Sequence, residues 1–313
     1  MSSCSVILPC YNVAQFLDRS IGAVLRQTRK AHEIIAADDG STDDTVRRLE
    51  KFGPAVRVLR ANRNEGPAQR RNDAISAATS DYIALLDPDD WWAENHLEIV
   101  AGLLDRFPEA GVAFSKVRLA GDIEGIWPSD TFCAGQPKDL LRIMMRNPVI
   151  QASSVVFRRS LFERMGPFVD YIEIRNGKKI YGWGGDYEWL LRAAALAPFV
   201  SSDMPTSYYY IRPNEAVVTP AKLIHIHRYR LMALAKLRKG ITDEKTWQDV
   251  LDRHQMAWEE DLERIWMRRE LGGLRRMCHF GMSVPHLRRH TVHYLPRACF
   301  GWLRPAKRGD GPA

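Results

Sequence analysis

The chain has 313 residues, of which 45% are hydrophobic and 27% are charged, an ordinary composition for a globular protein with a sizeable core. It contains no run of about 20 apolar residues, the length that a membrane-spanning helix needs. Its first residues lead directly into a strand-like run, so we expect neither a spanning helix nor a secretory signal. The five cysteines are scattered and odd in number, which is typical of reduced thiols in a cytoplasmic protein.

The first half alternates short apolar runs with segments of helical periodicity. The pattern predicts strands at residues 5–8, 33–37, 56–59 and 82–86, and helices at residues 17–28, 41–52, 67–78 and 97–107. Ser41, with Asp44 three positions later, predicts a capping box at the start of the second helix. Strands that alternate with helices of this length indicate an α/β fold, with a mostly parallel sheet and helices on both of its faces.

The second half is less regular and ends in a basic region. We expect a strand at 152–157, a helix at 184–197 and an aromatic strand at 207–212. Residues 222–313 are helical in pattern and hold 19 Lys and Arg against 10 Asp and Glu, whereas residues 1–221 hold 26 against 28. We therefore predict a first domain of residues 1–221 and a helical, basic C-terminal extension of residues 222–313 that suits an anionic surface.

Polar residues follow three of the predicted strands at their carboxyl ends. These are PCYN at 9–12, DDGSTDD at 38–44 and DPDD at 87–90. In open α/β sheets ligands bind at this edge, so the acids would converge there. Converging carboxylates repel one another unless a positive charge lies among them, and a hard divalent cation is the usual solution. The alternatives are a helix entry for Asp43 and Asp44 and an exposed turn for DPDD.

Several spaced motifs occur together and in one order. They read SVILPCYNVAQFLDRSIGAVLRQT, EIIAADDGSTDDT, NEGPAQRRNDAISAA, YIALLDPDDWW, NPVIQASSVVFRRSLFERMGPF and GGDYEWLLRAA. Over roughly residues 3 to 215 the chain resembles the inverting family 2 glycosyltransferases with the GT-A fold. The resemblance implies transfer of a sugar from a nucleotide-sugar, with a UDP-sugar as the family's default donor.

Five positions match the family's residues for the nucleotide. The resemblance implies that Pro9 and Tyr11 line the nucleobase pocket and that Asp39 holds the base. Arg71 stands where the family's arginine helps to hold the nucleotide, although in this chain a second arginine precedes it. Asp87 would contact the ribose.

The remaining matches concern the metal, the diphosphate and the acceptor. The resemblance implies that Asp89 binds Mn²⁺ or Mg²⁺ and that Asp186 is the catalytic base, preceded by Gly185 where the family usually has Glu. A carboxylate that takes the proton of the attacking hydroxyl, on the face opposite the leaving group, gives inversion. Arg212 is interpreted either as a diphosphate contact or as a surface arginine. Trp183 is interpreted either as an acceptor contact or as packing.

We expect the acceptor to be a glycan or a lipid-linked glycan, in cell-envelope or polysaccharide biosynthesis. From Arg264 onward the chain holds 11 Lys and Arg and two acids, interleaved with aromatic residues, which suits peripheral docking on the anionic inner face of a membrane. No nucleic-acid motif accompanies this charge, so nucleic acid is not expected, while a solvated helical face remains an alternative.

Two other functions remain open. A sugar nucleotidyltransferase is also α/β and metal-dependent, but it usually opens with a glycine-rich phosphate loop that this chain lacks. A non-catalytic module that merely holds a nucleotide or glycan is the other alternative. A nicotinamide dehydrogenase is disfavoured because no G-x-G-x-x-G follows the first strand.

Overall fold

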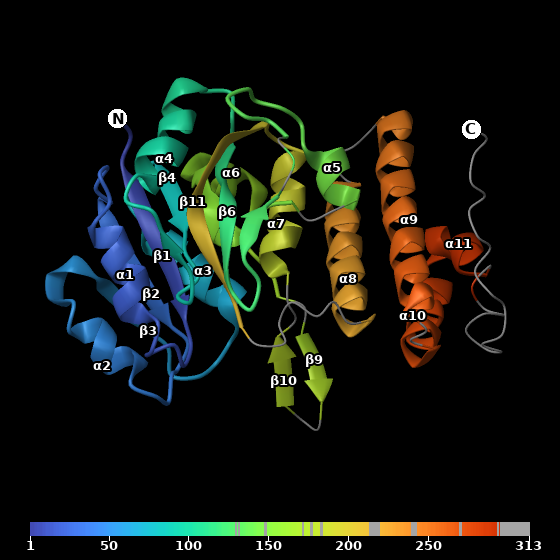
Figure 1. Cartoon of the computed structure of the whole chain (residues 1–313), viewed down its shortest axis with the longest axis horizontal. Coiled ribbons are helices and arrows are strands. Elements are labelled where there is room, and N and C mark those ends of the chain that lie inside the picture. Colours follow the sequence, from blue (N-terminus) through green and yellow to red (C-terminus); the bar gives the residue numbers. More distant parts are fainter. Residues whose placement is uncertain are drawn as a thin grey trace.

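The computed structural model describes residues 1–128, 130, 132–146, 149–170, 172–175, 178–181, 184–212, 220–238, 243–268, 271–292 and 294. The chain folds as an α/β protein around a nine-stranded sheet in the order β3-β2-β1-β4-β8-β6-β11-β5, with β7 paired to β6 (Figure 1). The strands of this sheet are β1 (Cys4–Cys10), β2 (Glu33–Asp38), β3 (Arg57–Arg60), β4 (Tyr82–Leu85), β5 (Trp91–Trp92), β6 (Val112–Gly121), β7 (Gly125–Trp127), β8 (Val155–Arg158) and β11 (Phe199–Ile211). A separate hairpin comprises β9 (Ile172–Arg175) and β10 (Lys178–Tyr181).

The helices alternate with these strands in the first half, as predicted. They are α1 (Leu17–Leu25), α2 (Thr45–Glu50), α3 (Pro67–Ala77), α4 (His96–Arg106), α5 (Leu141–Arg146), α6 (Arg159–Met165), α7 (Gly185–Ala194), α8 (Pro220–Leu237), α9 (Glu244–Met267), α10 (Leu271–Ser283) and α11 (Arg288–Val292). Short 3₁₀ turns occur at η1 (Gly53–Ala55), η2 (Ala152–Ser154) and η3 (Pro285–Leu287).

The sheet is parallel in its first half and mixed in its second. Strands β1 to β4 pair in parallel, whereas β8 lies antiparallel between β4 and β6. Strand β11 begins eight residues before the predicted 207–212, because it continues across register shifts at Ser202, Pro205 and Ser207 that interrupt the alternating pattern. The α/β architecture is therefore confirmed. The sheet differs from the predicted, mostly parallel one in its antiparallel strands.

Both faces of the sheet are buried, and alternation along β1 divides the core between them. Ile7 packs with α3, α5 and α7, whereas Val6 and Leu8 pack with α1, α2 and α4. A strand covered on both faces has apolar residues at successive positions, which is why the first strand was recognisable as a continuous run.

The predicted capping box is wrong. Helix α2 begins at Thr45, and its flanking residue Asp44 makes no side-chain cap bond. The hydroxyl of Ser41 instead accepts a hydrogen bond from the backbone N–H of Asn12, at 2.9 Å. Asp43 accepts the N–H of Thr45 at 2.9 Å and that of Ala14 at 3.2 Å. The residues expected to start the helix therefore tie its entry loop to the segment after β1.

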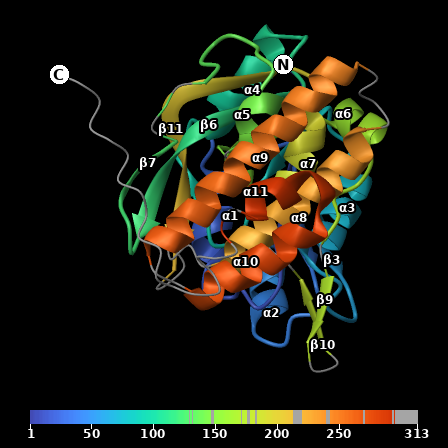
Figure 2. The ribbon, with the colours of Figure 1, turned by 90° about the vertical axis from the view of Figure 1, so that its right-hand side faces the viewer.

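The C-terminal helices form a layer beside the sheet domain, and α8 lies against α7 (Figures 1 and 2). Tyr229 and Ala233 of α8 and Val250 of α9 belong to the same apolar core as the sheet and α7. A second cluster joins α9, α10 and η3. The division at residues 221 and 222 remains a prediction, since packing is continuous across it. No helix within the described residues is both long and apolar enough to span a membrane.

Candidate functional site

The ends of β1 and β2 lie side by side at one edge of the sheet. Pro9 pairs in register with Ala37, and the N–H of Asp39 donates to the carbonyl oxygen of Cys10 at 2.8 Å. Tyr11 follows and is 45% exposed, so its ring is accessible. The predicted convergence of PCYN and DDGSTDD is therefore present.

Asp39 ties the end of β2 to the start of α3. Its two carboxylate oxygens accept the backbone N–H groups of Glu65 and Gly66, each at 2.9 Å. Arg70, also buried, approaches the same carboxylate with its Nε at 3.3 Å and pairs with Glu65. Burial raises the pKa of Asp39, while the backbone donors and Arg70 lower it. Arg70, the additional arginine before Arg71, therefore pairs with Asp39.

The three acids of DPDD have three different surroundings. Asp87 Oδ1 lies 2.6 Å from Arg71 Nη2, and Asp89 Oδ2 lies 2.6 Å from Arg212 Nη2. Asp90 is fully buried, and the combined effect of burial and the neighbouring carboxylates raises its pKa well above the usual value.

Asp90 acts as a link within the fold rather than as part of the open site. Its carboxylate accepts hydrogen bonds from Ser153 Oγ at 2.6 Å, from Gln151 Nε2 at 2.8 Å and from the N–H of Tyr210 at 2.9 Å. Ser153 lies in η2, Gln151 directly precedes it and Tyr210 lies in β11, so one carboxylate joins the loop after β4 to two distant segments. Only Asp87 and Asp89 of this motif retain carboxylates that face the arginines.

Arg71 lies among several carboxylates from different parts of the chain. The charges of Asp87, Asp186 and Asp170 raise its pKa, which keeps the guanidinium positive although burial opposes this. Asp186 stands in the first turn of α7 and is partly accessible. Burial and the charge of Asp87 raise the pKa of Asp186, whereas Arg71 and the N–H groups at the helix start lower it. Arg71 therefore brings the end of β4 and the start of α7 into one site.

Asp170 is a site residue that the sequence reasoning missed. Its Oδ2 accepts the backbone N–H of Ala68 at 3.0 Å, and burial raises its pKa to about 6 although Arg71 and this hydrogen bond lower it. The family-like motif that precedes it in the sequence ends at Phe168, two positions earlier. In the sequence Asp170 is a single acid in the connection between α6 and α7, and no periodic pattern distinguishes it from an ordinary loop residue.

The structure explains the glycine that precedes Asp186. A Cβ built on Gly185 would lie 2.7 Å from the carbonyl oxygen of Val169 and 3.1 Å from Asp170 Oδ1. A side chain at this position therefore collides with backbone, and the Asp170 carboxylate stands next to the space it would fill. The predicted acceptor contact, Trp183, lies outside the described residues.

A buried polar chain runs from α7 into the C-terminal helices. Arg230 donates to the hydroxyl of Tyr187 at 3.0 Å and contacts His227 Nδ1 at 3.2 Å. His227 Nδ1 lies 3.0 Å from His254 Nε2, and His254 Nδ1 lies 3.0 Å from His286 Nε2. Burial lowers the pKa of all three histidines, which favours their neutral forms. Because His227 Nδ1 faces the donor Arg230 and its Nε2 faces Asp261, His227 Nδ1 accepts from His254 Nε2, and His254 Nδ1 in turn accepts from His286 Nε2. The residue after Asp186 is thereby linked to α8, α9 and η3.

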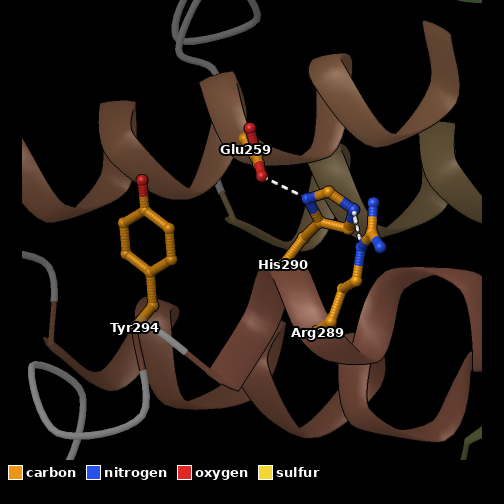
Figure 3. A pocket seen from close by; sticks show the side chains of 4 residues that line it. All are labelled: Glu259, Arg289, His290 and Tyr294. Atoms are coloured by element: carbon orange, nitrogen blue, oxygen red, sulfur yellow. Dashed lines mark hydrogen bonds and ion pairs between the residues drawn. The ribbon is translucent and has the colours of Figure 1, made fainter. Parts of the chain in front are cut away.

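A pocket of about 450 Å³ lies elsewhere, on the C-terminal helices (Figure 3). Glu259, Arg289, His290 and Tyr294 line it, and Glu259 hydrogen-bonds His290. None of these residues belongs to the polar strand ends. The four described cysteines, Cys4, Cys10, Cys133 and Cys278, are free and buried.

Residues 5–166 match the family model described as glycosyl transferase family 2, which is about half of the chain. The chain belongs to this family. A curated relative from Escherichia coli, UDP-Glc:alpha-D-GlcNAc-diphosphoundecaprenol beta-1,3-glucosyltransferase WfgD, is 35% identical over 101 residues, which are 32% of this chain and 40% of that protein. Among the first curated relatives the chain covers between 25% and 62% of their length.

Solved structures share the fold. TarS of Staphylococcus aureus, in complex with UDP-GlcNAc, superposes with a TM-score of 0.67 at 19% identity, over 90% of this chain and 82% of that one. The mannosyltransferase PcManGT of Pyrobaculum calidifontis, in complex with GDP-Man and Mn²⁺, gives a TM-score of 0.61 at 17% identity, over 95% and 80%. At these identities the likeness establishes the GT-A architecture alone.

Proposed function

We propose that the protein is a metal-dependent, inverting glycosyltransferase that transfers a sugar from a nucleotide-sugar to a hydroxyl of a glycan acceptor. The observation that carries the proposal is the position of Arg71 between Asp87, at the end of β4, and Asp186, at the start of α7. Two carboxylates on different segments support the proposal, because the metal site and the base must be separate. The guanidinium between them would supply positive charge to a leaving diphosphate.

On the donor side, Pro9, Tyr11 and Asp39 hold the nucleobase. Asp39 retains lone pairs beyond those used by Glu65, Gly66 and Arg70, since a carboxylate accepts about four hydrogen bonds. A base with an N–H on its pairing edge, such as uracil or guanine, is therefore compatible. We infer a UDP-sugar as the donor from the family resemblance, and Asp87 as the ribose contact.

The residues at Asp89 fit a divalent ion. Among the described residues no three His, Cys, Asp or Glu side chains are grouped as a metal site. Mg²⁺ and similar ions are commonly held by one or two carboxylates together with substrate phosphates and water, so Asp89, with Asp87 beside it, suffices. The ion would neutralise the charge that develops on the departing diphosphate. Arg212 pairs with Asp89, and we infer that it contacts the diphosphate when the ion binds Asp89.

On the acceptor side, Asp186 takes the proton from the attacking hydroxyl. Its raised pKa, caused by burial and by Asp87, makes it a better base than a solvated aspartate, while the charge of Arg71 favours its ionised form. The acceptor is a sugar hydroxyl of a glycan, and the E. coli relative, whose name specifies a diphosphoundecaprenol-linked substrate, favours a lipid-linked one.

Docking on a membrane is a second part of the proposal. Arg275 and Arg276 of α10 and Arg288 and Arg289 around the start of α11 are exposed, and each basic residue near anionic lipid contributes about 1 kcal/mol. The protein would then act at the inner membrane face, where a lipid-linked acceptor is found.

A panel of UDP-, GDP- and dTDP-sugars tests the enzymatic part, with Mn²⁺ or EDTA present. We expect one nucleotide class to raise the melting temperature and to be turned over, both dependent on metal. Pyrophosphate-dependent formation of a nucleotide-sugar would favour the nucleotidyltransferase alternative. Binding without turnover, with lipid-linked and soluble glycan acceptors present, would favour a non-catalytic module.

A further inference from the structure

Two observations single out the space beside Asp186. Gly185 has no side chain, and a Cβ there would lie 2.7 Å from the carbonyl oxygen of Val169. The space is also bounded by Asp170, whose Oδ1 would lie 3.1 Å from that Cβ. The carboxylate of Asp170, in the connection after α6, therefore lies next to Gly185, which has no side chain.

The two oxygens of Asp170 have different environments. Oδ2 accepts the N–H of Ala68 and supplies the cap that α3 lacks, since its N-cap residue is Gly66. Oδ1 has no hydrogen-bond partner among the described residues, although it lies close to Asp186 and Arg71, whose charges act on it. Asp170 is only partly buried, and Oδ1 is not one of the buried side-chain atoms that lack a partner, so this oxygen is open to a ligand hydroxyl that replaces water.

We propose that Asp170 is an acceptor-binding residue whose Oδ1 accepts a hydrogen bond from a second hydroxyl of the acceptor sugar, beside the hydroxyl that Asp186 deprotonates. This inference rests on the proposed function and adds an acceptor class to it, namely a pyranoside with a further hydroxyl near the attacked one. The two carboxylates would together fix the orientation of the acceptor, which favours attack because the reacting atoms are held in line.

The competing role is structural, as a cap for α3 alone. The two roles use different oxygens, so they are separable by Asp170→Asn. The amide oxygen of Asn can still accept the N–H of Ala68, which preserves the cap, but the other atom becomes an NH₂ that cannot accept a hydrogen bond. The variant therefore keeps the cap on α3 but loses the charged oxygen that would accept a hydrogen bond from the acceptor sugar.

The test uses the full chain with Mn²⁺, the nucleotide-sugar that the donor panel selects, and a panel of p-nitrophenyl pyranosides and their singly deoxygenated analogues. For Asp170→Asn we expect a rise of about 10- to 100-fold in the acceptor KM, the range for a lost hydrogen bond to a charged group. The melting temperature, the affinity for the nucleotide and the slow hydrolysis of the donor by water should stay near those of the wild type. Glu163→Gln, on the exposed side of α6, is the matched control.

The deoxygenated analogues decide between the roles. The analogue that lacks the contacted hydroxyl should be a poor acceptor for the wild type, and Asp170→Asn should cause no further loss with it. A variant that loses stability, or that slows transfer to every acceptor and to water equally, overturns the proposal in favour of the cap. Donor hydrolysis without any acceleration by a pyranoside contradicts the acceptor class, whereas no turnover of any nucleotide-sugar contradicts the proposed function itself.

Discussion

Arg212 Nη2 lies 2.6 Å from Asp89 Oδ2, so the residue after β11 neutralises the carboxylate that we assign to the metal. The pair joins the far end of the sheet to the loop after β4, and the guanidinium is half-exposed. A divalent ion and Arg212 would compete for the same oxygens of Asp89. Because of this competition, a variant of Arg212 should affect metal binding and diphosphate binding differently.

For Arg212→Gln we expect Mn²⁺ to bind the nucleotide-free protein at least as tightly as it binds the wild type, because Asp89 no longer has a competing cation. Turnover of the donor should fall about 10- to 100-fold, since the diphosphate loses a charged donor. Mn²⁺ titration by electron paramagnetic resonance and a nucleotide-release assay measure the two effects. Weaker Mn²⁺ binding in the variant would mean that Arg212 supports the metal site rather than competing with it.

Asp89→Asn should remove most of the metal dependence of nucleotide binding. The amide is a weaker ligand for a hard cation than the carboxylate is, so the shift in melting temperature that UDP and Mn²⁺ produce together should fall to the shift with UDP alone. Full binding and turnover in EDTA by the wild type would refute the metal assignment.

Asp186→Asn keeps the size of the side chain and removes the base. Transfer should drop by about 10²- to 10⁴-fold, the usual contribution of general acid–base catalysis, with little change in donor affinity. The alternative role of Asp186 is to stabilise the first turn of α7 through the helix dipole, which predicts a lower melting temperature with transfer mostly kept. Both quantities are measured on the same preparation.

The buried histidines predict a loss of stability in mild acid. Their pKa values are lowered in the folded protein, so below about pH 6.5 the unfolded chain binds protons that the folded chain does not. The free energy of unfolding should therefore decrease as the pH falls from 7.5 to 5.5, by up to about 1.4 kcal/mol per pH unit for each of His227 and His254. Carboxylates with raised pKa values, such as Asp170 and Asp261, have the opposite sign.

Comparison of variants isolates the contribution of the histidines. Urea unfolding at several pH values should give a smaller slope for His254→Gln than for the wild type, whereas the exposed His32→Gln should keep the wild-type slope. Parallel pH profiles for the wild type and His254→Gln would show that His254 does not stay neutral in the folded protein.

Liposomes test the membrane proposal. We expect co-sedimentation with vesicles that contain phosphatidylglycerol, and a decrease in binding with added salt because the Debye length shortens. Replacement of Arg275, Arg276, Arg288 and Arg289 by Gln should reduce the bound fraction, while the same number of changes on the exposed surface of residues 1–128 should not. Equal binding by both variants would assign the attraction to another surface.

The parts of the fold that the sequence predicted are those governed by local pattern. Apolar runs identified β1, β2 and β4 because strands buried on both faces show them directly, and polar residues at the strand ends indicated the site. Helix α2 was misplaced because the hydroxyl expected to cap it found a partner at Asn12, in another segment. Strand β6 was missed because its outer half is polar and partly exposed.

Roles set by tertiary contact were not predictable in the same way. Asp90 and Asp89 are adjacent and chemically identical, yet Asp90 is buried because donors from Ser153 and Tyr210, far along the chain, surround it. Asp170 joins the site only through the folding of the connection between α6 and α7 onto the start of α3. Such residues have no signature until the segments that meet at them are known.

The polar chain from Tyr187 to His286 has a consequence for how this protein can be divided or recombined. The turn that carries Asp186 is followed by a tyrosine whose hydroxyl is held by Arg230 of α8, and α8 shares its apolar core with the sheet. A fragment that ends at residue 221 would lack Tyr229 and Ala233, and the apolar side chains of α7 that share a core with them would face water. The C-terminal helices are thus not an interchangeable module, and grafting those of a relative would replace part of the support on which the position of Asp186 depends.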